Sequence, residues 1–199
     1  MLALQKAEKM KKQAFADRYP YGIFSCIRAM GHIYKSRGNF DLSAQYYQEA
    51  LDYMLKNMPD QDPSQLYSSL AEYYRNTQKD YATALDYCEK ALKSAKTERN
   101  IAQAMIEKCL VLFRQGRIDE FNDCYKEAVQ MADRCKLSAS VSLLIAHISK
   151  NILDKQYEQA HAHADQLSEE GLQQHAYIYE CAKDYPNAIK YLKKYHQQL

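Results

Sequence analysis

Apolar side chains recur every three or four residues along most of this chain, the spacing that places them on one face of an α-helix. The best-kept stretch carries large, small and aromatic residues in helical register at Ile27, Met30, Gly31 and Tyr34. After a glycine and an asparagine, a second stripe of the same kind follows at Phe40, Ser43, Tyr47 and Ala50. The segment therefore predicts two helices joined by a tight turn.

This two-helix pattern recurs along the rest of the chain and becomes less regular. Its second helices are predicted to begin at five aromatic or apolar residues, Phe40, Tyr81, Ile118, Tyr157 and Tyr185. The repeat units cover residues 22–56, 64–97, 101–135, 138–168 and 171–198, the fourth being the most degenerate. Residues 1–18 predict one more helix, either part of an incomplete preceding repeat or a capping helix. The second unit has one extra residue in its turn, within residues 76–80.

Residues that interrupt helices are scarce. The 199 residues include 5 glycines and 4 prolines, and no run alternates Val, Ile or Thr with polar residues between turn signals. The chain is therefore predicted to be all-α, with residues 1–199 forming a single repeat array.

The spacing of the repeat resembles a known family. A large-x2-large-small-x2-aromatic helix followed by a small-x3-aromatic-x2-Ala helix is similar to the tetratricopeptide repeat. This resemblance implies a right-handed α-α superhelix of about five helix–turn–helix repeats. It also implies a surface that binds a protein or peptide and has no catalytic activity.

Charge and hydropathy exclude two classes of partner. The chain has 27 Lys and Arg against 25 Asp and Glu, which is too balanced for the many phosphate contacts of a nucleic-acid-binding protein. The longest apolar stretch, residues 141–148, contains a serine and a histidine and is far shorter than the roughly 18 residues of a membrane span. We therefore expect no nucleic-acid binding and no membrane contact by this segment.

The six cysteines show no CxxC pair and no common spacing, so they do not form a zinc or redox motif. Cys88 and Cys109 occupy positions where the repeat pattern requires a buried small side chain, and buried thiols behave as small apolar groups. Free thiols favour a cytoplasmic location.

Sequence signals for catalysis and for cofactor binding are missing. The chain has no glycine-rich phosphate loop, no nucleophile elbow and no His-Glu metalloprotease spacing, so we expect neither an enzyme nor a cofactor. His161, His163, Asp165 and His175 are close in sequence, but His161 and Asp165 are four residues apart and can hydrogen-bond unaided. We therefore expect no metal site.

In such arrays the first helix of each repeat lines the concave side. Its residues outside the packing pattern form the predicted partner-binding groove, Arg28, His32, Lys35, Arg75, Ile106, Leu110, Phe113 and Arg114. The apolar members would receive an apolar segment of a peptide or partner helix. In the alternative interpretation, the apolar stripe packs against adjacent repeats. The lysines and asparagines with which some tetratricopeptide proteins clamp a terminal carboxylate are not matched here.

A narrower resemblance covers residues 19–54. Tyr19-Pro20-Tyr21-Gly22-Ile23, the segment from Arg28 to Tyr34, and Gly38-Asn39-Phe40 are similar to the repeat regions of signalling proteins in Bacteroidetes-type bacteria. That resemblance implies a sensor module of a histidine kinase or regulator, which would be periplasmic if membrane-anchored. The remaining interpretations are a scaffold and a regulator that responds to a short signalling peptide. Exposed apolar faces at the ends of the array would allow weak homo-oligomerisation.

Overall fold

A computed structural model of the chain describes residues 2–137, 140–167 and 171–197. Over these residues the backbone forms eleven α-helices and one π-helical turn, with no strand. The predicted edges of the fourth repeat at residues 138 and 168, and the predicted end of the fifth at 198, lie outside the described residues. The division into repeats at those boundaries stays a prediction.

The helices follow one another as consecutive antiparallel pairs after a single first helix, α1 (Leu2–Ala16). The pairs are α2 (Pro20–Ser36) with α3 (Phe40–Asn57), α4 (Ser64–Tyr73) with α5 (Tyr81–Ser94), α6 (Glu98–Arg114) with α7 (Ile118–Arg134), α8 (Val141–Leu153) with α9 (Tyr157–Ala164), and α10 (Gly171–Cys181) with α11 (Tyr185–His196). The π-helical turn η1 (Tyr74–Gln78) continues α4. This is the predicted all-α solenoid of helix–turn–helix units.

Each second helix begins at the residue that the sequence pattern predicted, namely Phe40, Tyr81, Ile118, Tyr157 and Tyr185. Local chemistry explains several of these starts. The side chains of Asn39, Asp80 and Asp184 each accept a hydrogen bond from the backbone N–H three residues later, which satisfies one of the free donors at a helix start. The preceding turns use a left-handed residue, which is glycine at Gly38 and Gly116.

The extra residue of the second repeat is accommodated as the π-helical turn η1. Insertion of one residue into a helix widens its hydrogen-bonding pattern locally, and such bulges are common at functional sites. After η1, Lys79 takes a left-handed conformation with φ of 56°, and the Asp80 N–H donates to the Tyr74 carbonyl oxygen at 3.1 Å. Lys79 is thereby placed on the inner side of the array.

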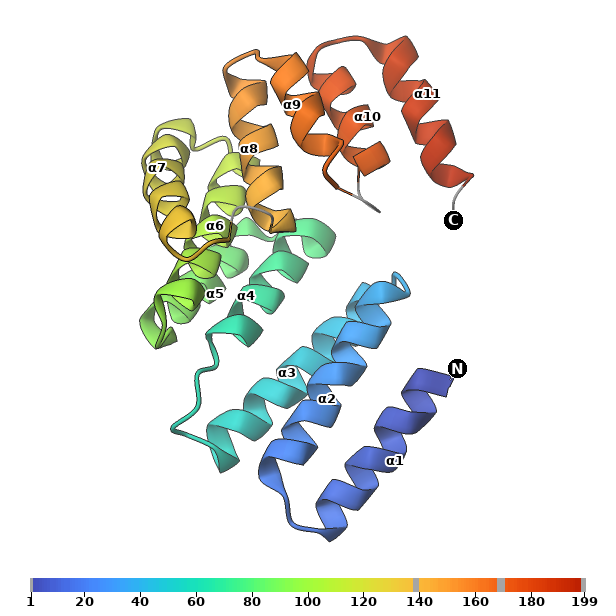
Figure 1. The fold of residues 1–199 in the computed structure, drawn as a ribbon, viewed down its shortest axis with the longest axis vertical. Coiled ribbons are helices and arrows are strands. Elements are labelled where there is room, and N and C mark those ends of the chain that lie inside the picture. The colour runs from blue at the N-terminus through green and yellow to red at the C-terminus, as the bar shows by residue number, and fades with distance from the viewer. Residues whose placement is uncertain (1, 138–139, 168–170, 198–199) are drawn as a thin grey trace.

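The helix pairs stack along a curved path (Figure 1). The first helices and the last pair lie at opposite ends of the curve, and both ends of the chain are on the same side of that view. Within the described residues, no helix is both long enough and apolar enough to cross a membrane.

Helix backbones approach most closely where the pattern places small residues. A Cβ atom added at Gly31 on α2 would lie 2.7 Å from two ring atoms of Tyr47 on α3. The Tyr47 ring is itself buried, and its hydroxyl is 3.0 Å from Nδ1 of His32. A glycine is therefore required at position 31, because any side chain there would collide with the Tyr47 ring of the paired helix.

This close contact predicts that Gly31→Ala destabilises the protein. Overpacking against a buried ring costs about 1–3 kcal/mol, and the better helix propensity of alanine recovers about 0.5–1 kcal/mol, so we expect a net loss of about 1–2 kcal/mol. Urea denaturation followed by circular dichroism measures the difference. Gly22→Ala is the control, because the Tyr19 ring that it would meet is exposed and can rotate away, and the buried neighbour, Ala14 Cβ, would be 3.1 Å away and not 2.7 Å. Equal effects of the two substitutions would contradict the packing argument.

Candidate binding groove

The inner side of the array holds a cavity of about 780 Å³. Its walls come from both ends of the chain, with the start of α3 and the turn η1 facing residues of α8, α10 and α11. The curvature of the array brings these distant segments onto one cavity. This cavity is called the groove below.

Apolar side chains that are exposed to solvent gather in the groove. Five of the large apolar residues in its wall are between 42% and 57% exposed, Phe40, Val141, Tyr185, Ile189 and Leu192. Tyr185, Ile189 and Leu192 lie at i, i+4 and i+7 on α11 and so share one helix face. The groove therefore presents exposed apolar side chains to solvent beside its polar lining residues.

Cations lie beside this apolar wall. Lys79 and Arg114 both line the groove, and neither is in a salt bridge with the described residues. The Arg114 guanidinium lies over the Tyr177 ring at 4.9 Å from its centroid. Partial burial lowers the pKa of Lys79, and the neighbouring charges of Arg114 and Arg75 lower it further. Of the carboxylates that line the groove, Glu180 forms no salt bridge with the described residues.

Two ion pairs tie neighbouring repeats together along the inner side. Lys35 Nζ on α2 lies 2.6 Å from Glu72 on α4, and both side chains are partly exposed. Arg75 Nε lies 2.7 Å from Oε1 of Glu107 on α6, and these side chains are only 5% and 3% exposed. Arg75 also donates to the Asn76 side chain. Burial raises the pKa of the Glu107 carboxyl, and Arg75 opposes that shift.

A second, polar cavity of about 330 Å³ adjoins the groove and shares Ser69, Glu72 and Ser142 with it. Its other walls are mainly polar residues of α4 and α6, among them Gln65, Asn100 and Gln103. The inner side thus passes from a polar half to an apolar half.

Only some of the residues predicted to form the partner-binding groove line the observed groove. Lys35, Arg75 and Arg114 line the groove. Arg28 and His32 do not, because Arg28 lies over the Phe24 ring of its own helix and His32 contacts Tyr47. A partner-binding role of these residues stays a prediction.

The predicted apolar stripe of the third repeat is wrong as a set of accessible contacts. Ile106 and Leu110 are 0% and 2% exposed and belong to the core between α6, α7 and α8. Phe113 is partly buried, with its ring 5.6 Å from that of Phe121. Ile106 and Leu110 pack as the alternative interpretation describes, whereas Phe113 is only partly covered. Neighbouring helices cover α6 on several sides, so its apolar residues are in the core.

The apolar wall on α11 was missed by the sequence interpretation. Leu192 of this wall is 42% exposed and lines the groove. The i, i+4, i+7 spacing of Tyr185, Ile189 and Leu192 was a readable signal. Phe40 and Val141 gave no such signal, because each is the first residue of its helix.

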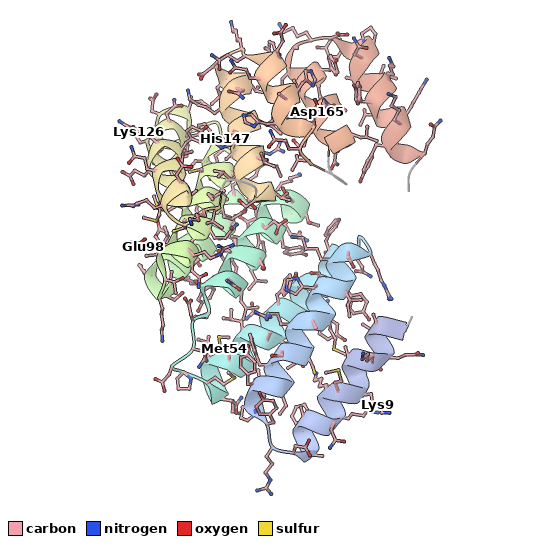
Figure 2. The ribbon with its side chains drawn as sticks, viewed as in Figure 1. Lys9, Met54, Glu98, Lys126, His147 and Asp165 are labelled. Atoms are coloured by element: carbon pink, nitrogen blue, oxygen red, sulfur yellow. The ribbon has the colours of Figure 1, made fainter. Side chains whose placement is uncertain are left out.

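Histidines pack the fourth and fifth repeats against each other. Nδ1 of His161 lies 2.7 Å from Nδ1 of His175, and Nε2 of His175 lies 3.0 Å from the Asp165 carboxylate. His147 on α8, labelled with Asp165 in Figure 2, stacks on His163 and contacts the Tyr125 hydroxyl at 2.6 Å. Among the described residues no group of three His, Cys, Asp or Glu side chains is arranged to hold a metal ion. Hydrogen bonds account for His147, His161 and His175, whereas Nδ1 of His163 is buried without a hydrogen-bond partner among the described residues.

Comparison with known proteins identifies one segment of the chain. The model of the tetratricopeptide repeat matches residues 25–62, which cover most of α2 and all of α3. The α2–α3 pair is therefore a tetratricopeptide repeat. No curated protein matches this chain.

Solved structures share the fold of this chain, and two of them illustrate it. BtubC (BKLC) from P. vanneervenii has 16% identity and a TM-score of 0.61, and the match covers 98% of this chain and 89% of BtubC. Aspartyl phosphate phosphatase F from Bacillus subtilis has 15% identity and a TM-score of 0.66, with 98% of this chain and 60% of the phosphatase covered. This chain thus spans about three fifths of the phosphatase. At such identities the likeness concerns the fold.

The buried Arg75–Glu107 pair predicts a strong response to breaking it. Arg75→Met would leave the Glu107 carboxylate buried without its partner, which costs about 3–5 kcal/mol. The double variant Arg75→Met/Glu107→Leu replaces both charges with apolar groups and should recover most of that loss. Urea midpoints of the three proteins measure the effect. A double variant as unstable as the single one would show that the pair does not account for the loss.

The histidine cluster predicts a loss of stability on acidification. Burial lowers the pKa of His161, and the proximity of His175 lowers it further, against an opposing effect of Asp165. The unfolded chain therefore takes up this proton first, near pH 6.5, so stability is complete above that pH and declines as pH falls toward the folded-state pKa. Burial and His163 lower the pKa of His147 in the same direction.

Thermal melts between pH 7.5 and pH 5 test this expectation. His161→Gln should flatten the dependence, whereas His196→Gln at an exposed position should leave it as in the parent protein. If the melting temperature falls with pH equally in both variants, His161 is not a cause of the pH dependence.

Proposed function

We propose that this chain is a non-catalytic repeat domain that binds an extended peptide segment of a partner protein in its groove. The segment would present apolar side chains to α11 and a carboxylate to Lys79 and Arg114. The domain would act as a scaffold or as the sensor module of a larger signalling protein. The tetratricopeptide fold supports the general role, since such repeats serve protein interaction.

One observation carries the proposal. Phe40 of the first repeat and the face of Ile189 and Leu192 in the fifth line the same cavity while remaining about half exposed. Exposed apolar side chains scattered singly need no explanation, but contiguous ones in a concave site are typical of binding surfaces. A ligand that bridges the two walls would cover apolar surface at both ends of the array at once.

The charges beside the apolar wall favour an acidic residue in the ligand. Arg114 is close enough to Lys79 for its positive charge to lower the pKa of Lys79. Neither side chain forms a salt bridge with a carboxylate of the described residues. A ligand carboxylate would relieve this repulsion and form charge-assisted hydrogen bonds. The remaining carboxylate of the wall, Glu180, would disfavour a second acidic residue near α10.

The second candidate function is a regulator that responds to a short peptide. The cavity of about 780 Å³ lies within the range of about 300–1,000 Å³ that is typical of ligand-binding clefts and cavities, which suits a segment of a few residues. The fold likeness to an aspartyl phosphate phosphatase brings no activity to this chain, because the match covers 60% of that protein at 15% identity. The regulator and the scaffold differ in whether a short peptide binds alone.

Selection from a library of random peptides, followed by titration calorimetry, tests both candidates. We expect selected peptides to contain apolar residues next to Asp or Glu. Ile189→Asp should weaken their binding at least tenfold, because it puts a charge on the apolar wall. Met10→Asp is the matched control, since Met10 is 54% exposed against 52% for Ile189 and lies outside the groove. Lys79→Gln should weaken binding of acidic peptides but not of their amide analogues.

Sedimentation velocity distinguishes peptide binding in the groove from self-association of the chain through α11. If the apolar face of α11 is covered by a second copy of the chain, sedimentation velocity will show a concentration-dependent dimer that Ile189→Asp abolishes. A monomer with tight peptide binding is the result expected here. Equal affinities of Ile189→Asp and Met10→Asp would overturn the groove assignment.

A further inference from the structure

Two cysteines from paired helices of the third repeat touch each other. Sγ of Cys109 on α6 lies 2.7 Å from Sγ of Cys124 on α7. A disulfide bond is about 2.05 Å long, so the two sulfurs need to approach by well under 1 Å to bond. Both residues are free thiols in this structure, and they lie 15 residues apart in sequence.

We propose that Cys109 and Cys124 form an intramolecular disulfide when the protein meets a low-molecular-weight disulfide such as oxidised glutathione. Their contact makes this pair a modification site inside the repeat array. The proposal is independent of ligand binding, because neither cysteine lines the groove.

Accessibility indicates which sulfur reacts first. Cys109 is fully buried, whereas Cys124 is partly exposed and so can meet a reagent from solvent. The hydrogen bond from the Cys109 thiol lowers the pKa of Cys124, and Lys108 lowers it further. That hydrogen bond and burial raise the pKa of Cys109. The thiolate is the attacking species in disulfide exchange, so Cys124 is the nucleophile and Cys109 the resolving cysteine.

The exchange balances without another reactant. The Cys124 thiolate attacks one sulfur of oxidised glutathione, forming a mixed disulfide and expelling a glutathione thiolate. Cys109 then gives its proton to that thiolate and attacks Cys124 Sγ, which expels the second glutathione thiolate, and this thiolate takes up from solvent the proton that Cys124 released. Overall, two protein thiols are oxidised by two electrons to one disulfide, and one glutathione disulfide is reduced to two glutathione thiols.

The bond would join α6 and α7, the two helices of one repeat. Closing this loop restricts the unfolded chain, which raises stability as long as the native geometry already suits the bond. The Sγ–Sγ distance of 2.7 Å favours such a geometry, so we expect oxidation to raise the melting temperature by several degrees and to leave peptide affinity unchanged. The array would therefore be more stable in an oxidising compartment than in a reducing one.

Peptide mapping after equilibration in glutathione buffers is the decisive experiment. The full chain is incubated at a series of ratios of oxidised to reduced glutathione, alkylated, and digested with trypsin. Cleavage at Lys108, Arg114, Arg117 and Lys126 places the two cysteines in separate peptides, 109–114 and 118–126. We expect one cross-link between these peptides, with the other cysteines alkylated.

Variants distinguish a resolved disulfide from a simple adduct. Cys124→Ser should abolish both the cross-link and the rise in melting temperature, whereas Cys135→Ser, at another partly exposed cysteine, should retain both. The mapping of the unmodified chain decides the question even if a variant fails to fold. Cys124 that carries glutathione without bonding to Cys109, a bond from Cys124 to Cys88, or free thiols throughout the series would overturn the proposal.

Discussion

The buried ion pair between Arg75 and Glu107 is the interaction on which the inner side of the array depends. Arg75 belongs to the π-helical turn that ends the first helix of the second repeat, and Glu107 lies in the first helix of the third. Since an unpaired buried charge is costly, the pair holds the turn against α6. The same turn carries Lys79 into the groove. The extra residue that forms this π-helical turn thus helps to position the second repeat against the third. It also places the positive charge of Lys79 in the groove.

Residues from both ends of the array line one groove. Phe40 and the α11 face of Ile189 and Leu192 line one cavity and stay exposed, which leaves apolar surface in water. Covering that surface is the driving force that a ligand would use. Because the walls belong to the first and last repeats, a bound segment would also fix the curvature of the array. Such a link between ligand and shape is what a sensor module would need.

Much of the fold could be predicted from the sequence, because each second helix starts at an aromatic or apolar residue after a turn, and Asn39, Asp80 and Asp184 cap three of these starts. Less of the site could be predicted. Ile106 and Leu110 have the spacing of a groove-facing stripe, but whether such a stripe meets solvent depends on how tightly neighbouring helices wind around α6. How tightly these helices pack depends on all the repeats together, and the spacing within one helix does not report it. The Cys109–Cys124 contact was hidden for a similar reason, because the two residues meet only through the pairing of α6 with α7.

The central claim is that one ligand segment touches both ends of the array. Photo-cross-linking of a library-selected peptide that carries a benzophenone at successive positions tests this most directly. The account predicts that different positions of one peptide label the region around Phe40 and the α11 segment around Ile189 to Leu192, in the same complex. Labelling confined to the outer helices α5 and α7, or to one end of the groove at every position, would contradict it.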